Sequence, residues 1–351
     1  MKIALLVLVT IASAEILYQV TAPSPRLTFG DAGRDQWTPA QFSPDGKAIL
    51  ARGHRADSMR GPPFDGVLKV WDTLSGSAVG TFVPIDEKPT QIIHRVGFSH
   101  DGNLVMACGQ DLPLVMWDFT TKKQVQVLGG ANPSFPKPTT WPVECFSLAP
   151  RSTEVLTSQN DIIRLWDMKT GKMEKETDIN KFHRISPPVS ISFAKNGEYI
   201  IFDSGTQISI WEFKTMELRF RGTNHASEFP NKDFRLPQKA AILGRVLAPG
   251  GRSLLIPTRL GEIIELDIES GKQTKKYNIK PDGDIHVLAV SPKGDKIMTT
   301  GFHGNTIVYS FPECKEIKRM PGYGHVQFSP DGKTALTFTK NGRMMLWDLD
   351  K

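Results

Sequence analysis

The sequence predicts an all-β fold made of seven copies of one antiparallel group of strands. Two observations predict it: a short apolar strand that stops at a Ser-Pro-Asp-Gly type of turn recurs along the chain, and a later strand in each copy ends at a large side chain, most often Trp followed by Asp. Pro presets φ for a tight turn, Asp caps the turn through its side chain, and Gly tolerates φ > 0. Each copy therefore predicts three strands separated by sharp reversals.

The last copy shows the pattern most clearly. Its first strand ends at Phe328 before Ser329-Pro-Asp-Gly332, Asn341-Gly342 marks the second reversal, and the third strand ends in Trp347-Asp348. The residues that end the first strands are Phe42, Phe98, Phe146, Phe193, Leu247, Val290 and Phe328, and those that end the third strands are Trp71, Trp117, Trp166, Trp211, Leu266, Tyr309 and Trp347.

These repeats resemble the WD-repeat β-propeller family over residues 26 to 351. The resemblance is carried by seven strand-turn signals in register with four Trp-Asp pairs, at Trp71-Asp72, Trp117-Asp118, Trp166-Asp167 and Trp347-Asp348. It implies a seven-bladed ring of four-stranded antiparallel blades that serves as a rigid platform for a protein or peptide partner. The Gly-His pair usual in the family has no His here, so we expect the blades to cohere mainly by apolar packing.

The first copy is preceded by a short segment that can close the ring. The last copy ends at Lys351, soon after Trp347, and so lacks a fourth, outer strand. Leu27 to Phe29 are predicted to supply that strand. Such closure joins the two ends of the chain by main-chain hydrogen bonds and removes exposed strand edges.

Residues 1–14 stand apart as a predicted secretory signal. Lys2 precedes an apolar run from Ile3 to Ile11, and Ala12-Ser-Ala14 provides the small residues of a cleavage site. We therefore expect an exported protein, periplasmic or extracellular, with a spacer at 15–25 and one propeller domain at 26–351. The apolar run is shorter than the roughly 20 residues that cross a bilayer, but residues 3–20 remain an alternative as a membrane anchor.

The composition limits the classes of partner and cofactor. Cys108, Cys145 and Cys314 are odd in number, so they do not predict a disulfide framework. Loss of Lys2 with the signal lowers the formal net charge from +6 to +5, a modest basic excess that permits an anionic partner without naming one. We expect no nucleic-acid partner, no metal or other cofactor, no membrane span after cleavage, and a monomeric ring.

Four long connections are predicted to form a rim on one face, at 53–66, 129–142, 179–188 and 221–241. Loops longer than about 12 residues in compact domains are usually functional or disordered. These combine Phe side chains with nine basic and four acidic residues, and aromatic residues and Arg are enriched in protein interfaces. An alternative is that the Phe side chains simply pack on the blade ends. The predicted partner-binding residues are Arg55, Arg60, Phe64, Phe135, Phe182, Arg184, Phe229, Phe234 and Arg235.

No catalytic motif is present in the sequence, so a non-enzyme is predicted. Glu144 and Arg245 fall in slots that are apolar in the other copies, and we expect both to turn toward a water-filled central channel as candidate ligand residues. His94, His286 and His325 lie near the starts of inner strands. The alternative function is therefore a propeller enzyme or ligand-binding protein that uses the channel mouth with a metal or cofactor.

Overall fold

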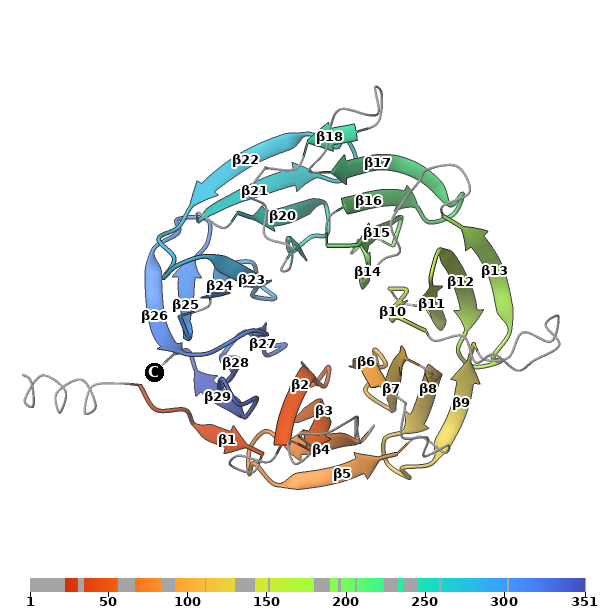
Figure 1. The fold of residues 1–351 in the computed structure, drawn as a ribbon, viewed down its shortest axis with the longest axis horizontal. Coiled ribbons are helices and arrows are strands. Elements are labelled where there is room, and N and C mark those ends of the chain that lie inside the picture. The colour runs from red at the N-terminus through yellow and green to blue at the C-terminus, as the bar shows by residue number, and fades with distance from the viewer. Residues whose placement is uncertain are drawn as a thin grey trace, which may run out of the picture.

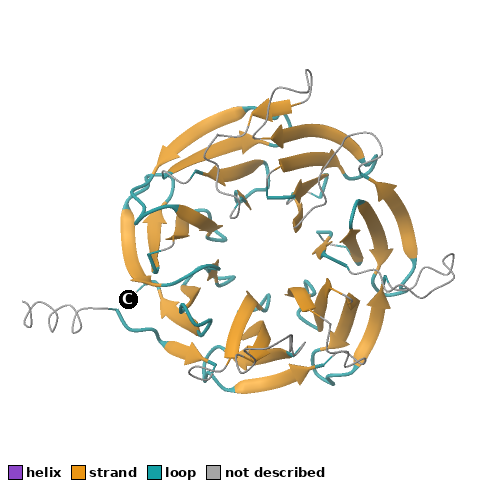
Figure 2. Ribbon diagram, in the orientation of Figure 1, coloured by secondary structure: helices purple, strands orange, loops and turns teal. Residues whose placement is uncertain are grey.

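The computed structural model describes the chain from residue 23 to residue 350 with gaps. The described residues are 23–30, 35–55, 67–83, 92–110, 112–129, 143–150, 152–179, 190–194, 197–205, 207–223, 233–235, 245–258, 261–301 and 303–350, of which 35–39, 53–55, 92, 110, 223 and 233–235 are described by backbone alone. Every regular element among them is a β-strand (Figure 2). The predicted signal and most of the spacer lie outside the described residues.

The strands form seven sheets arranged in a ring, which confirms the predicted seven-bladed propeller (Figure 1). Within each blade the first strand lies nearest the axis and the last lies on the perimeter. The strands are, for blade one, β2 (Asp35–Phe42), β3 (Ala48–Arg55), β4 (Leu68–Asp72) and β5 (Ala78–Phe82); for blade two, β6 (Ile92–Phe98), β7 (Leu104–Gln110), β8 (Leu112–Asp118) and β9 (Gln124–Leu128); for blade three, β10 (Cys145–Leu148), β11 (Glu154–Gln159), β12 (Ile162–Asp167) and β13 (Met173–Asp178); for blade four, β14 (Ser190–Phe193), β15 (Tyr199–Asp203), β16 (Gln207–Glu212), β17 (Glu217–Thr223) and β18 (Asp233–Arg235); for blade five, β19 (Val246–Leu247), β20 (Ser253–Pro257), β21 (Glu262–Asp267) and β22 (Gln273–Asn278); for blade six, β23 (Ile285–Val290), β24 (Lys296–Gly301), β25 (Asn305–Ser310) and β26 (Glu316–Pro321); and for blade seven, β27 (Gln327–Phe328), β28 (Thr334–Phe338), β29 (Met344–Asp348) and β1 (Leu27–Phe29).

The predicted closure of the ring is confirmed. β1 pairs antiparallel with β29, with Leu27 opposite Leu346 and Phe29 opposite Met344, so the first strand of the chain is the outer strand of the last blade (Figure 1). Just before β1, the Arg26 N–H donates to the Leu346 carbonyl over 2.7 Å, and its guanidinium lies 3.2 Å from the Asp348 carboxylate. Both main-chain and side-chain bonds therefore join the two ends of the chain.

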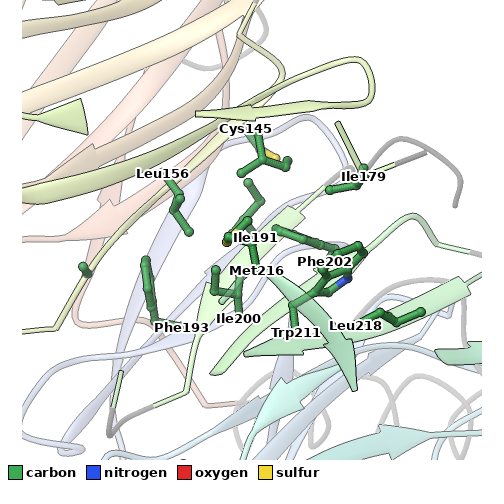
Figure 3. Close-up of a cluster of buried hydrophobic side chains, with 12 residues drawn as sticks. Cys145, Leu156, Ile179, Ile191, Phe193, Ile200, Phe202, Trp211, Met216 and Leu218 are labelled. Carbon is green, nitrogen blue, oxygen red and sulfur yellow. The ribbon is translucent and has the colours of Figure 1, made fainter. Parts of the chain in front are cut away.

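The hydrophobic core is divided into seven clusters, one at each interface between neighbouring blades. Figure 3 shows the cluster between blades three and four, where Ile191 and Trp211 lie among apolar residues that include Cys145 and Leu156 of blade three. Between blades one and two, Phe82 meets Trp117 edge to face with 6.2 Å between ring centroids. Apolar packing thus joins each described blade to the next. This was expected because the repeats lack the His of the Gly-His pair that is usual in the family.

The polar residues of the repeat cap its turns. The Ser43 hydroxyl donates to the Asp45 carboxylate over 2.6 Å, as the Ser-Pro-Asp-Gly pattern predicts. After the third strand of blade two, the Asp118 carboxylate accepts from the Thr121 main-chain N–H and hydroxyl over 2.7 and 2.8 Å. These hydrogen bonds favour the charged form and lower the pKa of Asp118 below its ordinary value. The Asp of the Trp-Asp pair therefore stabilises the reversal that follows its strand.

One position in each of these later turns has a left-handed backbone. It lies five residues after the end-of-strand anchor, and its φ falls between 58° and 74° in blades one to six. The residue at this position lies against the outer strand of the preceding blade. Lys122 of blade two, for example, lies against Gly80 of β5 in blade one. The residues are Gly76, Lys122, Gly171, Met216, Gly271 and Cys314. Glycine is unstrained there, whereas any other side chain reaches into the gap between two blades.

Candidate functional site

The ring has two faces with different kinds of connection. Because the strands of a blade alternate in direction, the turns between first and second strands and between third and fourth strands share one face, here called the turn face. The links between second and third strands and between successive blades share the other, here called the connection face. The described strands that flank the stretches 56–67, 83–91, 129–144, 179–189 and 224–245 have the ends next to these stretches on the connection face.

The predicted partner-binding residues are not among those whose side chains the structure describes. Arg55 ends β3, and Phe234 and Arg235 lie in β18, where the backbone alone is described. The other six, Arg60, Phe64, Phe135, Phe182, Arg184 and Phe229, lie outside the described residues. Their role stays a prediction.

Part of the predicted rim has another role. β18 runs parallel to β17, with Arg221 opposite Asp233, and adds a fifth strand to the outer edge of blade four (Figure 1). Arg221 falls within the predicted rim, but it lies within β17 and is only 4% exposed. β18 therefore covers the outer edge of β17.

The prediction for Glu144 rests on a wrong register in blade three. The Ala149 N–H donates to the Glu154 carbonyl, as the Ser43 N–H does to the Ala48 carbonyl in blade one. Leu148 is therefore the residue that ends the first strand, and Phe146 fills the apolar slot that the sequence pattern assigns to Glu144. Glu144 lies just before β10, half-buried, where burial and then the charge of Asp161 raise the pKa of its carboxyl group.

The predicted orientation of Arg245 toward the water of the channel is wrong. Its side chain is 2% exposed and its guanidinium forms an ion pair with the Asp203 carboxylate at the end of β15 in blade four, itself 15% exposed. A second guanidinium nitrogen donates to the Gly205 carbonyl over 2.7 Å. Desolvation raises the pKa of Asp203 and lowers the pKa of Arg245, so burial outweighs their mutual attraction. The pair joins blades four and five.

The sequence offered a signal for Asp203 that we missed. Asp203 lies three residues after the buried Ile200 of β15. In blade one the residue equivalent to Ile200 is Ile49, so the residue equivalent to Asp203 is Arg52. Arg52 also reaches the following blade, where its guanidinium donates to the Ile93 carbonyl. A charged residue in this slot thus indicates a polar contact between neighbouring blades.

The three inner-strand histidines do not form a metal site with their neighbours. Among the residues that the structure describes, no group of three or more His, Cys, Asp or Glu side chains is placed to hold a metal ion. Burial, then Arg52 and Arg95, lower the pKa of His94. His325 is exposed to water, and its ring lies 5.9 Å from that of Phe338.

Two cavities open on the turn face. One, of about 520 Å³, lies beside the axis between inner strands of blades seven, one, two and three, and its lining includes Gln41, Arg95 and Phe146. The other, of about 510 Å³, lies between blades two and three. Both are lined by Ser99 and His100, so they adjoin. This pair of cavities was not predicted, because the sequence directed attention to the long connections.

Across the described part of the chain, no helix has the length and apolarity needed to cross a membrane.

Comparisons with known proteins agree with this architecture. No protein-family model matches the chain. Over 231 residues, 66% of its length, the chain is 22% identical to the serine-threonine kinase receptor-associated protein of Gallus gallus, a WD-repeat protein, and the match spans 57% of that relative. A chain in the crystal structure of a mitotic checkpoint complex is 16% identical, with a TM-score of 0.67 over 93% of this chain and 91% of that one, a likeness that shows the fold alone. With its seven repeats and this ring, the chain is a seven-bladed β-propeller that is similar to WD-repeat proteins.

Proposed function

We propose that the protein is an exported, non-enzymatic platform that binds a protein or peptide partner on its connection face. The observation that carries the proposal is the closed ring, in which the long stretches between described strands all leave from one face. A rigid scaffold that carries its long loops on one face can position binding residues there without a loss of stability of the fold. The turn face, by contrast, carries the short capped reversals.

The relatives support a role in protein assembly. One is described as a receptor-associated protein, and the other belongs to a multi-protein checkpoint complex. Both descriptions concern those proteins. For this chain they favour a binding platform over an enzyme, and the identity of the partner follows from neither.

The export part of the proposal is supported by the apolar run and the Ala12-Ser-Ala14 sequence at the start of the chain. We expect the mature protein to begin at Glu15. Intact-mass measurement of the protein purified from the producing cell checks this, and a soluble cytosolic product that keeps Met1 would contradict it.

The partner-binding part is tested by replacing Phe182, Arg184, Phe234 and Arg235 together by Ala. Partner capture from the envelope fraction should be lost while the melting temperature changes little, because aromatic and Arg anchors dominate interface energies. A matched control replaces Leu74 and Arg252, exposed residues on the turn face, by Ala. If the variant with four substitutions still captured the partner, or if the control lost capture equally, the binding site would not be on the connection face.

A further inference from the structure

The outer strands of the blades differ in what they expose at the perimeter of the ring. In blades one to six the outer strand carries one extra residue where its register with the third strand shifts. That residue and the one two positions later are, in chain order, Val79 and Thr81, Val125 and Val127, Glu174 and Glu176, Arg219 and Arg221, Thr274 and Lys276, and Ile317 and Arg319, with Arg26 and Thr28 in their place in blade seven. Among these described strands, blade two alone has an apolar residue at both positions.

The edge of blade two lacks the charge that keeps strand edges apart. Natural edge strands usually carry charged residues that prevent pairing with another sheet, and blades three to seven each have at least one at the two positions. β9 of blade two has none along its length and is the last described strand of its sheet (Figure 1). In blade four, β18 pairs with β17 at Arg221, the equivalent of Val127, so an outer strand of this ring can accept a further strand.

The side chains of β9 alternate between use inside the ring and exposure. Gln126 turns toward blade three, where its Nε2 would lie 2.6 Å from a Cβ at Gly171. Val125 and Val127, on either side of it, are 52% and 40% exposed. The Val127 main-chain N–H donates over 3.2 Å to the side chain of Gln126, an acceptor outside the sheet. Two valines and an edge N–H are therefore presented at the perimeter.

The outer strand of blade one is less suited to pairing, although it is also uncharged. Gly80 lies at its centre, and glycine inside a strand weakens it. The Lys122 ammonium reaches this strand from blade two and would lie 2.9 Å from a Cβ at Gly80. It is held there between the rings of Phe82 and Phe119, at 5.1 and 4.2 Å from their centroids. This lysine therefore directs its charge to the edge of blade one and away from β9.

A second copy of β9 matches this edge in sequence. A twofold axis through Gln126 places Val125 of one copy opposite Val127 of the other, and the reverse. Directly opposite residues of antiparallel strands share one face of the sheet, so the four valines form one apolar row. Lys123 then falls opposite Gly129 of the second copy, so the lysines do not face each other. A strand that pairs with itself must tolerate its own residues opposite, which valine and glutamine do and like charges do not.

We propose that the protein forms a twofold symmetric dimer in which β9 of one copy pairs antiparallel with β9 of the other. The blade two sheets of the two copies become one continuous sheet, with Val125 and Val127 at its centre. A twofold contact of this kind closes at the dimer. The dimer replaces the monomeric ring expected from the sequence. It uses the perimeter of the ring, so the inference does not depend on partner binding at the connection face.

The test is the concentration dependence of the mass of the purified protein, measured by analytical ultracentrifugation. The contact is one strand wide on each copy, so it should be weaker than a standard interface of about 1,600 Å², and a concentration series is needed. Val125→Lys/Val127→Lys and Val125→Glu/Val127→Glu place like charges opposite each other. Val79→Lys/Thr81→Lys is the matched control, because it adds the same charge at the equivalent exposed positions of β5.

We expect the mass of the parent protein to rise with concentration to that of a dimer and no further. The dimer dissociation constant should rise about tenfold or more in each charged β9 variant, because like charges are opposed, and should be unchanged in the control. An equal mixture of the Lys and Glu variants should form dimers again, since each Lys then faces a Glu. Melting temperatures near that of the parent show that the variants are folded.

Three outcomes would overturn the inference. A parent protein that stays monomeric at every concentration would leave this edge to a strand of another protein. A dimer that both charged β9 variants keep would lie elsewhere on the ring. A mixture of the two charged variants that stays monomeric would contradict the pairing of Val125 with Val127.

Discussion

Deletion of residues 26 to 30 is expected to leave a protein that melts roughly 5 to 10 °C lower or aggregates. The deletion removes β1 and so exposes the outer edge of β29 in blade seven. It also removes Phe29, which is 2% exposed and meets Trp71 of blade one with ring centroids 6.4 Å apart. An uncovered strand edge beside an exposed apolar interface promotes association between copies.

The expected size of this effect follows from the apolar burial and the hydrogen bonds that β1 supplies. Burial of a Phe side chain contributes about 1.5 to 3 kcal/mol, and each main-chain hydrogen bond of β1 adds about 1 kcal/mol. A loss of several kcal/mol is large against the roughly 5 to 15 kcal/mol that holds a domain folded. Thermal unfolding and light scattering of the deletion variant and of the parent protein measure the two outcomes.

Two single substitutions serve as controls for the deletion. Phe29→Ala should destabilise by about 3 to 5 kcal/mol through the cavity that it leaves, whereas Thr28→Ala, at an exposed position of the same strand, should change stability by less than about 0.5 kcal/mol. An unchanged melting temperature in the deletion would mean that the ring closes without β1.

Arg245→Ala should cost about 3 to 5 kcal/mol at neutral pH, because it leaves the carboxylate of Asp203 buried without its cation. Chemical denaturation followed by tryptophan fluorescence measures this. Asp203→Asn combined with Arg245→Met should recover most of the loss, since a neutral side chain needs no cation and its oxygen still accepts from the Gly205 N–H.

The cost of Arg245→Ala should depend on pH in a defined direction. Burial already raises the pKa of Asp203 above 3.8, and removal of the cation that lowers it raises it further. A carboxyl group with a raised folded-state pKa loses stability as pH rises from its unfolded value to its folded one. The difference between variant and parent should therefore be greatest near pH 7 and shrink toward about pH 4. A difference that grows on acidification would contradict a buried, unpaired carboxylate.

Local turn chemistry made most of the fold predictable. Ser329-Pro-Asp-Gly332 acts through hydrogen bonds within a few residues, so the strands on either side of it could be placed without knowledge of the rest. The closing strand β1 followed because the seventh copy lacked an outer strand. In blade three the turn begins at Ala149-Pro150, without the usual Asp or Gly, and the register of the first strand was therefore misassigned by two residues.

Contacts between blades were much harder to predict. Asp203 and Arg245 lie 42 positions apart in the sequence. They meet because the end of β15 in blade four lies beside the residue that precedes β19 in blade five. Gln126 of β9 packs against Gly171 between blades two and three, whereas Lys122 packs against Gly80 between blades one and two, and this exchange of partners is visible only in the structure. Residues of the long connections were predicted by composition alone, and that prediction stays untested.

The pairing of β1 with β29 also sets the order in which the chain can fold. Blades one to six contact their sequence neighbours, so they can assemble one after another as the chain is made. Leu27 must wait for Leu346, the most distant pairing among the described strands. Until the last residues are present, Phe29 and the edge of β1 have no cover, and the chain is at its most prone to misassociation.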